Sequence, residues 1–344
     1  MPDSTTTATN IVISSPGLDS NSPDAGRLKL FLTNFAGEVL TAYRRASVTS
    51  GRHLERVIAS GKAAEFPVLG RAKANYLAPG ANLDDLRKAN SQTSVKIMID
   101  GLLTSDVLIT DLDEAMNHYD LRSEYAYQIG EALAMARDGG LLAEIAKMAM
   151  VTKELLPGLG KGEVVTRSVA GGLTAETEAL GKAVVEELLH IKTAMSNNYV
   201  PLEGRVCYML PVVKNALIAN RDTINKLYGG VGTIVDGDVN KICGFDIVET
   251  PHLTAGGITN DTGAKPNGLI QGEGHIFPAT YKNTAAFLCA HRYTVGTLTL
   301  KSFALEHARR ANYQADQIIG KYAIGQGGLR PEAAFMGVIT TTSA

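Results

Sequence analysis

Apolar residues recur every three or four positions in three stretches of the chain, which predicts three amphipathic helices. The first covers residues 25–46 and the third covers residues 175–198. The second runs from 112 to 149, and its 38 residues would extend about 57 Å at 1.5 Å per residue. Asp111 and Glu114 form a variant of the capping box at its start. A helix of this length is too long to lie inside a compact domain of average size, so we expect it to act as a spine.

Two consecutive glycines, Gly139 and Gly140, interrupt the apolar pattern of this long helix. Such a pair costs about 2 kcal/mol relative to two alanines. Two interpretations are open. The glycines permit close packing against a neighbouring strand or mark a break between two helices, or they form a bend that lets the helix change curvature.

Residues 51–97 have a different pattern, because they are polar, punctuated by turn residues and contain few apolar positions. The scattered apolar residues are Phe66, Val68, Leu69, Tyr76, Leu77 and Leu83. Two extended legs joined by a turn are marginally stable in water unless another element covers them. Legs of about 20 residues at roughly 3.3 Å per residue would reach on the order of 60 Å. We therefore expect this arm to bury its apolar residues on another subunit, which indicates assembly rather than chemistry.

Short β-forming runs predict strands before the long helix and in the last third of the chain. These are Val95–Asp100, Leu102–Ile109, Ala285–Ala290, Val295–Leu300 and Phe335–Thr340, with a further strand inside Tyr199–Leu210. Val212–Leu227 is predicted to be helical, and Thr233–Val248 to be a hairpin that turns at Asp236-Gly237. Residues 155–172 are rich in helix breakers and predict a connection, and residues 254–275 predict a surface loop. The pattern leaves residues 302–323 undecided between helix and strand.

Composition narrows the class of protein. The chain has 344 residues, of which 45% are hydrophobic and 20% charged, which is ordinary for one large or two medium globular domains. A formal net charge of −2 disfavours a globally basic nucleic-acid-binding protein. The chain has no run of 18 uncharged apolar residues, so we expect no membrane partner. The first 26 residues lack the features of a signal peptide and are expected to form a tail that is flexible or ordered by a partner.

Motifs that carry catalysis or bind cofactors and metals are missing from the sequence. There is no GxSxG and no HExxH, and Gly158–Gly162 has neither P-loop nor dinucleotide-binding spacing. The widely spaced Cys207, Cys243 and Cys289 predict buried, reduced thiols. Asp236 and Asp238 fit a turn better than a calcium loop. We therefore expect no catalytic residue, no cofactor and no metal.

Basic residues outnumber acidic ones between positions 41 and 73. They are Arg44, Arg45, Arg52, Arg56, Lys62, Arg71 and Lys73. One interpretation is a solvated face. The other is a set of intersubunit salt bridges or contacts with a polyanion.

Five blocks of the sequence resemble the major capsid proteins of T7-like short-tailed phages (podoviruses). They are Gly37–His53, Phe66–Lys88, Ile99–Ala146, Pro251–Gly257 and Leu305–Ala334, and they occur in the order of that family. None of them is a catalytic motif, but long contiguous matches of this kind are highly specific.

The resemblance implies an α+β fold, the HK97-like capsid fold, and a division of the chain into named parts. These are an N-terminal arm (1–50), an extended E-loop hairpin (51–97), a peripheral domain (98–172) with the spine helix 112–149, an axial domain (173–284), and a return to the peripheral domain (285–344). Such proteins are shell subunits that form the pentamers and hexamers of an icosahedral head. The implied partners are copies of the chain, a scaffolding protein, a portal and non-specifically packaged double-stranded DNA, with assembly in the host bacterial cytoplasm.

Within this frame three groups of residues are candidates for function. Phe66, Leu69, Arg71, Tyr76 and Leu77 are expected to make intersubunit contacts, Arg44 and Arg45 to face DNA, and Gly139 and Gly140 to bend the spine as the shell expands. Two other functions are open. One is an encapsulin-like protein cage of the same fold. The other is an α/β enzyme whose site forms in the loop 254–275, where His252, His275 and Asp261 would converge.

Overall fold

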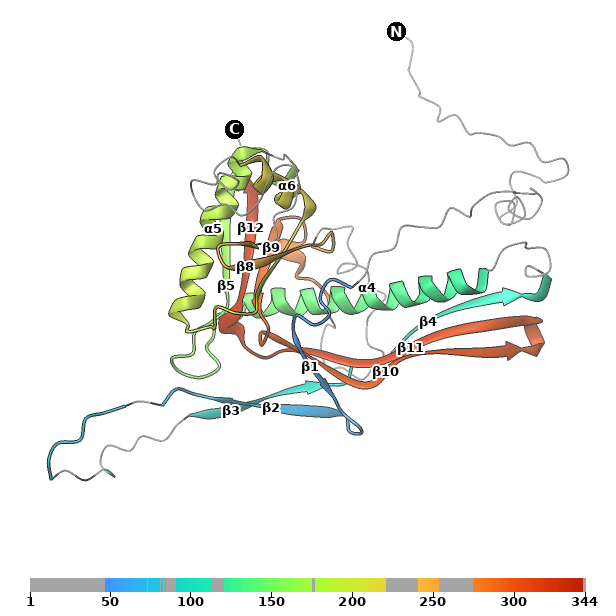
Figure 1. Cartoon of the computed structure of the whole chain (residues 1–344), viewed down its shortest axis with the longest axis horizontal. Helices are drawn as coiled ribbons and strands as arrows, with labels where there is room; N and C mark the ends of the chain where they lie inside the picture. Colours follow the sequence, from blue (N-terminus) through green and yellow to red (C-terminus); the bar gives the residue numbers. More distant parts are fainter. Residues whose placement is uncertain are drawn as a thin grey trace, which may run out of the picture.

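The chain folds around two β-sheets, a projecting hairpin and one long helix (Figure 1). The structure is a computed structural model. It describes residues 47–342 except 73, 81, 83, 85–90, 113–120, 175–176, 221–240 and 254–274. Helices and strands both contribute heavily to these residues, as expected for an α+β fold. Within these residues, no helix is long and apolar enough to cross a membrane.

The first sheet has six strands in the order β5-β12-β9-β6-β8-β7. The strands are β5 (Glu163–Val169), β6 (Arg205–Met209), β7 (Lys241–Ile242), β8 (Phe245–Glu249), β9 (Ala285–His291) and β12 (Ala334–Thr341). β12 pairs with β5 in parallel and with β9 antiparallel, while β6 pairs with β9 antiparallel and with β8 in parallel. Helices α5 (Glu178–Asn197) and α6 (Pro211–Ala219) contribute Leu188 and Leu217, both fully buried, to the same core.

The second sheet has four strands in the order β1-β10-β11-β4 and is much longer than it is wide (Figure 1). Its strands are β1 (Leu54–Val57), β4 (Gly101–Thr110), β10 (Val295–Arg310) and β11 (Ala315–Gly328). β10 and β11 form an antiparallel hairpin closed by the short helix η6 (Ala311–Tyr313), and β4 is the opposite edge from β1. Strands β2 (Ala63–Leu69) and β3 (Gln92–Met98) pair separately as an antiparallel hairpin.

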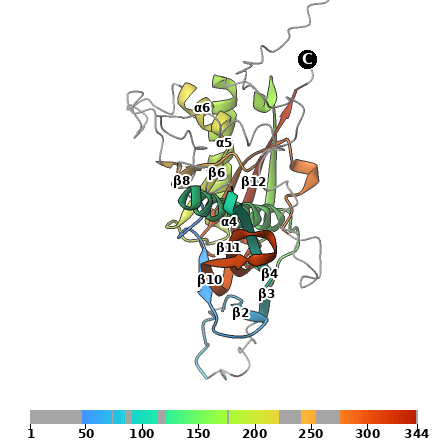
Figure 2. The same ribbon diagram turned by 90° about the vertical axis from the view of Figure 1, so that its right-hand side faces the viewer.

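Helix α4 (Leu121–Ala149) joins the two sheets. Its C-terminal half buries Leu141, Leu142 and Ile145 in the core of the six-stranded sheet. Its N-terminal half packs Ile129 and Leu133 against the four-stranded sheet. Figure 2 shows α4 end-on, between the unit that holds α5 and α6 and the long sheet with the hairpin on the other side. One helix therefore supplies part of two separate hydrophobic cores.

Several sequence predictions are confirmed, with changed boundaries. The helix expected over 175–198 is α5, and the long helix 112–149 corresponds to α4 from Leu121 onward. The strand expected over Val295–Leu300 extends to Arg310, and the undecided residues 302–323 form most of β10 and β11. The predicted helix 25–46 and the residues 113–120 lie outside the described residues.

Three interpretations need correction. The breaker-rich connection 155–172 contains a strand, β5, which pairs with β12 over seven residues. The described hairpin within 233–248 turns at Cys243 and Gly244, whose φ angles of 52° and 88° suit a two-residue turn, whereas Asp236-Gly237 lies outside the described residues. Residues 54–57 do not belong to the projecting hairpin, because they form β1 and pair with β10.

The packing of α4 on the long sheet gives a test of the fold. Leu133 is 4% exposed beside Ile129 and Ile318. Leu133→Ala should lower the free energy of unfolding by about 2–5 kcal/mol, because it leaves a cavity between helix and sheet. Leu102→Ala is the matched control, since Leu102 is 54% exposed on β4, and it should cost less than about 1 kcal/mol. Urea denaturation of the full chain measures both values, and equal losses would contradict this packing.

Candidate assembly surface and the polar network of the long helix

The base of the β2–β3 hairpin is buried within its own chain. Val68 packs with Leu156 and Leu159. Ile97 packs in a second cluster with Leu298, and Phe66 is partly buried against that cluster. The Arg56 guanidinium lies 5.6 Å from the centre of the Phe66 ring. The structure therefore places Phe66, predicted as an intersubunit contact, against its own subunit.

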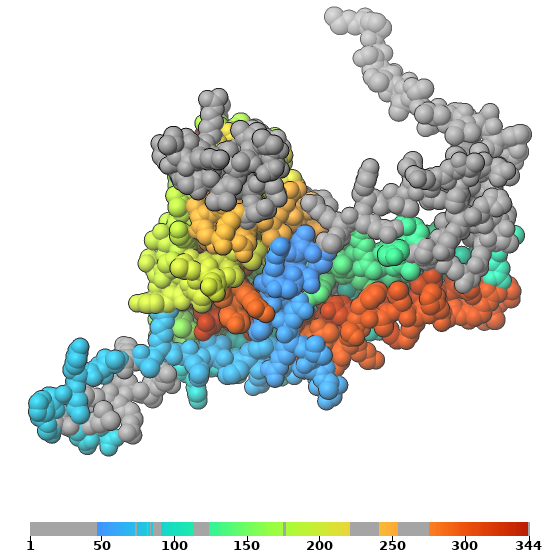
Figure 3. Space-filling model, viewed as in Figure 1, coloured from blue at the N-terminus to red at the C-terminus, as the bar shows by residue number. Residues whose placement is uncertain are grey.

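The end of the hairpin is exposed. The backbone N–H of Gly70 donates to the carbonyl of Ser91, and every described residue from 71 to 80 is exposed. Leu69 is 60% exposed, Leu77 is 47% exposed and Tyr76 is fully exposed. Figure 3 shows this segment, in cyan, projecting from the body of the molecule. Three apolar residues of the predicted contact set thus face solvent in a single subunit.

Arg71, the fifth residue of that set, contacts its own chain. Its guanidinium donates to the carbonyl of Asn198 at 2.5 Å and lies 4.2 Å from the centre of the Tyr199 ring. The sequence carried no signal for this contact, since the residues are more than a hundred positions apart. The candidate DNA-facing residues Arg44 and Arg45 lie outside the described residues.

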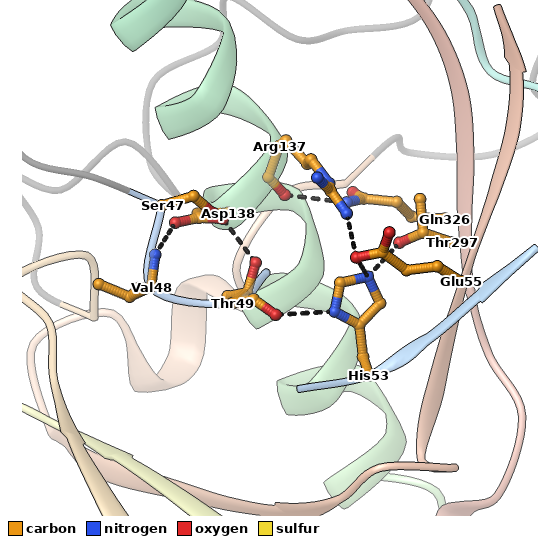
Figure 4. A network of polar contacts seen from close by, with 9 residues as sticks. All are labelled: Ser47, Val48, Thr49, His53, Glu55, Arg137, Asp138, Thr297 and Gln326. Atoms are coloured by element: carbon orange, nitrogen blue, oxygen red, sulfur yellow. Dashed lines mark hydrogen bonds and ion pairs between the residues drawn. The ribbon is translucent and has the colours of Figure 1, made fainter. Parts of the chain in front are cut away.

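Asp138, in the middle of α4, holds the segment that leads into β1 (Figure 4). It is 2% exposed and accepts three hydrogen bonds, from the Ser47 hydroxyl at 2.6 Å, the Val48 N–H at 2.7 Å and the Thr49 hydroxyl at 2.5 Å. A buried carboxylate is costly unless it is hydrogen-bonded, and here three donors meet it. This side chain fixes where the chain enters the body of the molecule.

His53 continues the network toward the long sheet (Figure 4). Burial lowers the pKa of His53 below its usual value, so the ring is neutral at pH 7. Its Nδ1–H donates to the Thr49 carbonyl at 2.9 Å, which leaves Nε2 to accept from the Thr297 hydroxyl at 2.9 Å. The ring thereby ties the turn before β1 to strand β10.

Arg137 and Gln326 join α4 to two strands of the long sheet, β1 and β11. The Arg137 guanidinium donates to Glu55 on β1 at 2.6 Å. The Arg137 carbonyl accepts from the Gln326 side chain on β11 at 2.8 Å. Because Gln326 is 6% exposed, its amide needs this partner.

The glycine pair lies inside one continuous helix, so the interpretation of a break between two helices is wrong. A Cβ on Gly140 would lie 2.2 Å from the Gln326 Oε1 and 3.4 Å from the His275 Cβ. This geometry supports the packing interpretation for Gly140. A bend at Gly139 and Gly140 stays a prediction.

His275 links α4 to the junction of β3 and β4. Its Nδ1 lies 2.9 Å from Glu144 and its Nε2 lies 2.5 Å from Asp100, which also accepts the backbone N–H of Gln326. Burial alone would lower the pKa of His275, but hydrogen bonds and attraction to both carboxylates outweigh it and raise the pKa to about 9. The imidazolium then donates through both nitrogens.

This geometry bears on the alternative of an enzyme in the loop 254–275. Both ring nitrogens of His275 are occupied by structural partners, so the ring is a poor general base. Asp261 lies outside the described residues. Across the residues that the structure describes, no group of three or more His, Cys, Asp or Glu side chains is arranged to hold a metal ion.

Comparisons with known proteins place the chain among phage shell proteins. The Gp10A-like family, described as "Major capsid protein", matches residues 65–337. The chain is 48% identical to the major capsid protein of Escherichia phage T7 over 319 residues, which cover 90% of this chain and 91% of that protein. It is 49% identical to the major capsid protein of Enterobacteria phage T3 over 322 residues, with the same coverage.

Solved structures agree with this similarity. The capsid of Cyanophage P-SCSP1u superposes with a TM-score of 0.76 at 32% identity, covering 95% of this chain and 98% of that one. The mature capsid of bacteriophage PhiM1 has a TM-score of 0.74 at 17% identity, covering 91% and 93% of the two chains, which shows the shared fold alone.

The first prediction from this site concerns Gly140. Gly140→Ala should lower the free energy of unfolding by about 1–3 kcal/mol, because the new methyl group displaces the buried Gln326 amide from the Arg137 carbonyl. In a Gln326→Ala background the same substitution should cost nothing or stabilise the helix. A double-mutant cycle by urea denaturation measures the coupling, and a coupling of zero would contradict the packing explanation.

The second prediction concerns pH. The folded-state pKa of His275 is raised from 6.5 to about 9, so its contribution to stability is complete below pH 6.5 and is lost as pH rises through 9. Glu144, whose other cationic neighbour is Lys147, has a lowered pKa, so its contribution is lost only as pH falls into the acid range.

Unfolding free energies at pH 7 and pH 10 for the wild type and His275→Gln test this. The wild type should lose more stability than the variant between the two values, because all other titrating groups are common to both. Equal losses would show that the His275 ion pairs do not stabilise the fold.

Proposed function

The chain belongs to the Gp10A-like family of major capsid proteins, and we propose that it assembles as pentamers and hexamers into the icosahedral head of a T7-like phage. Its fold is the HK97-like capsid fold, shared with the phage capsids above. It is a structural component of the virion capsid. Its assembly in the host bacterial cytoplasm is part of the proposal.

The projecting hairpin is the observation that best supports the proposal of shell assembly. A single subunit exposes Leu69, Tyr76 and Leu77 on a segment that reaches beyond its own core. Exposed apolar residues gathered on a projection typically mark a surface that binds another protein. The proposed partner is a second copy of the chain, because a closed symmetric shell places identical copies side by side in repeated orientations.

The parts of the fold take names under this proposal. The β2–β3 hairpin is the E-loop, α4 is the spine, the long sheet is the peripheral domain and the six-stranded sheet is the axial domain. β5, β9 and β12 belong to the six-stranded sheet, so the axial domain that we propose takes in these three strands as well as the described parts of residues 173–284.

Three further partners belong to the proposal. They are double-stranded DNA packaged without sequence preference, a scaffolding protein and a portal. Their support is the sequence similarity to capsid proteins of T7 and T3. With a net charge of −2, the chain would bind DNA only through local basic patches, and weakly at physiological salt.

The double variant Tyr76→Ser/Leu77→Ser tests the assembly surface. Burying the two side chains on a neighbour contributes roughly 3–6 kcal/mol, so the concentration needed for assembly should rise about 100-fold or more. Sedimentation and electron microscopy of the purified chain measure the closed shells. Tyr76→Phe/Leu77→Met, which keeps both surfaces apolar, is the control and should assemble as the wild type does. Shells from the serine variant at wild-type concentration would exclude this segment as a contact.

A further inference from the structure

We propose that Arg71 is the positioning residue that sets the direction of the projecting hairpin, by docking on the C-terminal end of helix α5 in its own subunit. This inference rests on the proposed assembly role of the hairpin. It concerns residues within one chain, so it makes predictions that the intersubunit contacts alone do not.

The docking site combines two kinds of attraction for a guanidinium. The Asn198 carbonyl, which accepts from Arg71 at 2.5 Å, follows directly after the last residue of α5. The C-terminal end of a helix carries partial negative charge, which favours a cation. The Tyr199 ring, 4.2 Å from the Arg71 guanidinium carbon, adds a cation–π contact. Lysine would reproduce neither the planar stack nor the forked geometry.

The residues that receive Arg71 are themselves held in place. The Asn198 side-chain amide donates to the Glu332 carbonyl at 3.1 Å. A Cβ on Gly160 would lie 2.6 Å from the Asn198 Oδ1, so glycine makes room for this side chain. Tyr199 adopts a φ of +57°, which is uncommon for a non-glycine residue and turns the chain directly after the helix end.

Arg205 secures the same corner from inside. It is 2% exposed and donates to the carbonyls of Val200 at 2.7 Å and Pro201 at 2.9 Å. Weaker contacts reach the Lys192 carbonyl and the Ser196 hydroxyl in the last turns of α5. Arg71 therefore binds a rigid acceptor, which is a condition for setting a direction.

A buried carboxylate adds charge complementarity. One oxygen of Glu332, Oε2, is buried without a hydrogen-bond partner among the described residues. Burial raises the pKa of Glu332, and a hydrogen bond from the backbone, followed by the positive charges of Arg330 and Arg71, opposes that rise. The Arg71 cation thus favours the ionised form of Glu332, the residue whose backbone carbonyl accepts from Asn198.

Arg71 occupies the position where a contact controls direction most strongly. It directly follows Gly70, which pairs with Ser91 at the end of the two-stranded part of the hairpin. A fully extended segment of five residues, the separation of Arg71 and Tyr76, would span about 17 Å, so a rotation of about 20° at Arg71 would then move Tyr76 by about 6 Å. That displacement exceeds the tolerance of a packed contact between subunits.

The contact is exposed, so its loss should leave the fold intact. Arg71 lies at the surface, and Tyr199 is 78% exposed. Exposed ionic and cation–π contacts contribute little to stability. A role in direction therefore predicts a change in hairpin geometry and in assembly with an unchanged melting temperature.

The first experiment measures direction in the full chain below its assembly concentration. Spin labels on Ala78→Cys and Lys182→Cys, in a Cys243→Ser background, report the distance from the hairpin to α5. Arg71→Ala and Tyr199→Ala should each broaden the distance distribution at least twofold, and combining them should add little. Arg71→Lys should broaden it partly, while Tyr199→Phe should leave it narrow. An unchanged distribution in Arg71→Ala would overturn the proposal.

The second experiment measures shell assembly by the same variants. Arg71→Ala should lower the yield of closed shells at least fivefold, with its melting temperature within about 2 °C of the wild type. Tyr199→Phe, which keeps the aromatic ring, should give the wild-type yield. Wild-type yield for Arg71→Ala alongside failure of Tyr76→Ser/Leu77→Ser would refute the positioning role and keep the assembly role. Wild-type yield for both would refute the proposed contact surface itself. A large fall in melting temperature for Arg71→Ala would make Arg71 a residue of the fold instead.

Discussion

The rest of the structure depends on helix α4 burying opposite ends of its length in two different cores. Leu141, Leu142 and Ile145 lie in the core of the six-stranded sheet, while Ile129 and Leu133 lie under the long sheet. Both sheets bury apolar side chains of α4. Neither sheet can therefore move away from the helix without exposing those side chains to water. The helix thus joins the two sheets into one rigid frame. A shell subunit needs such a frame to keep the contacts at one edge in a fixed position relative to those at the other.

Polar groups on the same helix determine what is attached to this frame. Asp138 accepts three hydrogen bonds from residues 47–49, and Arg137 reaches Glu55 on β1. Glu144, six residues after Asp138 on the same helix, binds His275. The buried donors and acceptors would be costly if left unpaired, so each attachment has essentially one geometry. Gly140 lies among these groups because a larger residue would displace Gln326.

The hairpin shows a division of roles along one element. Its base is apolar and buried on its own subunit through Val68 and Ile97, while Tyr76 beyond it is fully exposed. Under the proposed assembly role, the hairpin gains from a fixed direction, since ordering it in advance lowers the entropy lost on association. Arg71 stands at the boundary between the two parts, which is why a residue expected to contact a neighbour can act through its own chain.

Sequence patterns alone predicted the long helix, the extended arm and most strand positions, and contiguous similarity identified the family. The helix and strand predictions rest on short stretches of sequence, because the spacing of apolar residues in such a stretch indicates the local conformation. The three-dimensional fold was needed to show that residues 155–172 contain β5 and that 302–323 form strands. It was also needed to identify the hydrogen-bond partners of Asp138 and His275. β5 needs β12 beside it, and Asp138 and Ser47 are 91 positions apart. Such pairings depend on how the whole chain packs, and no local window of sequence contains them.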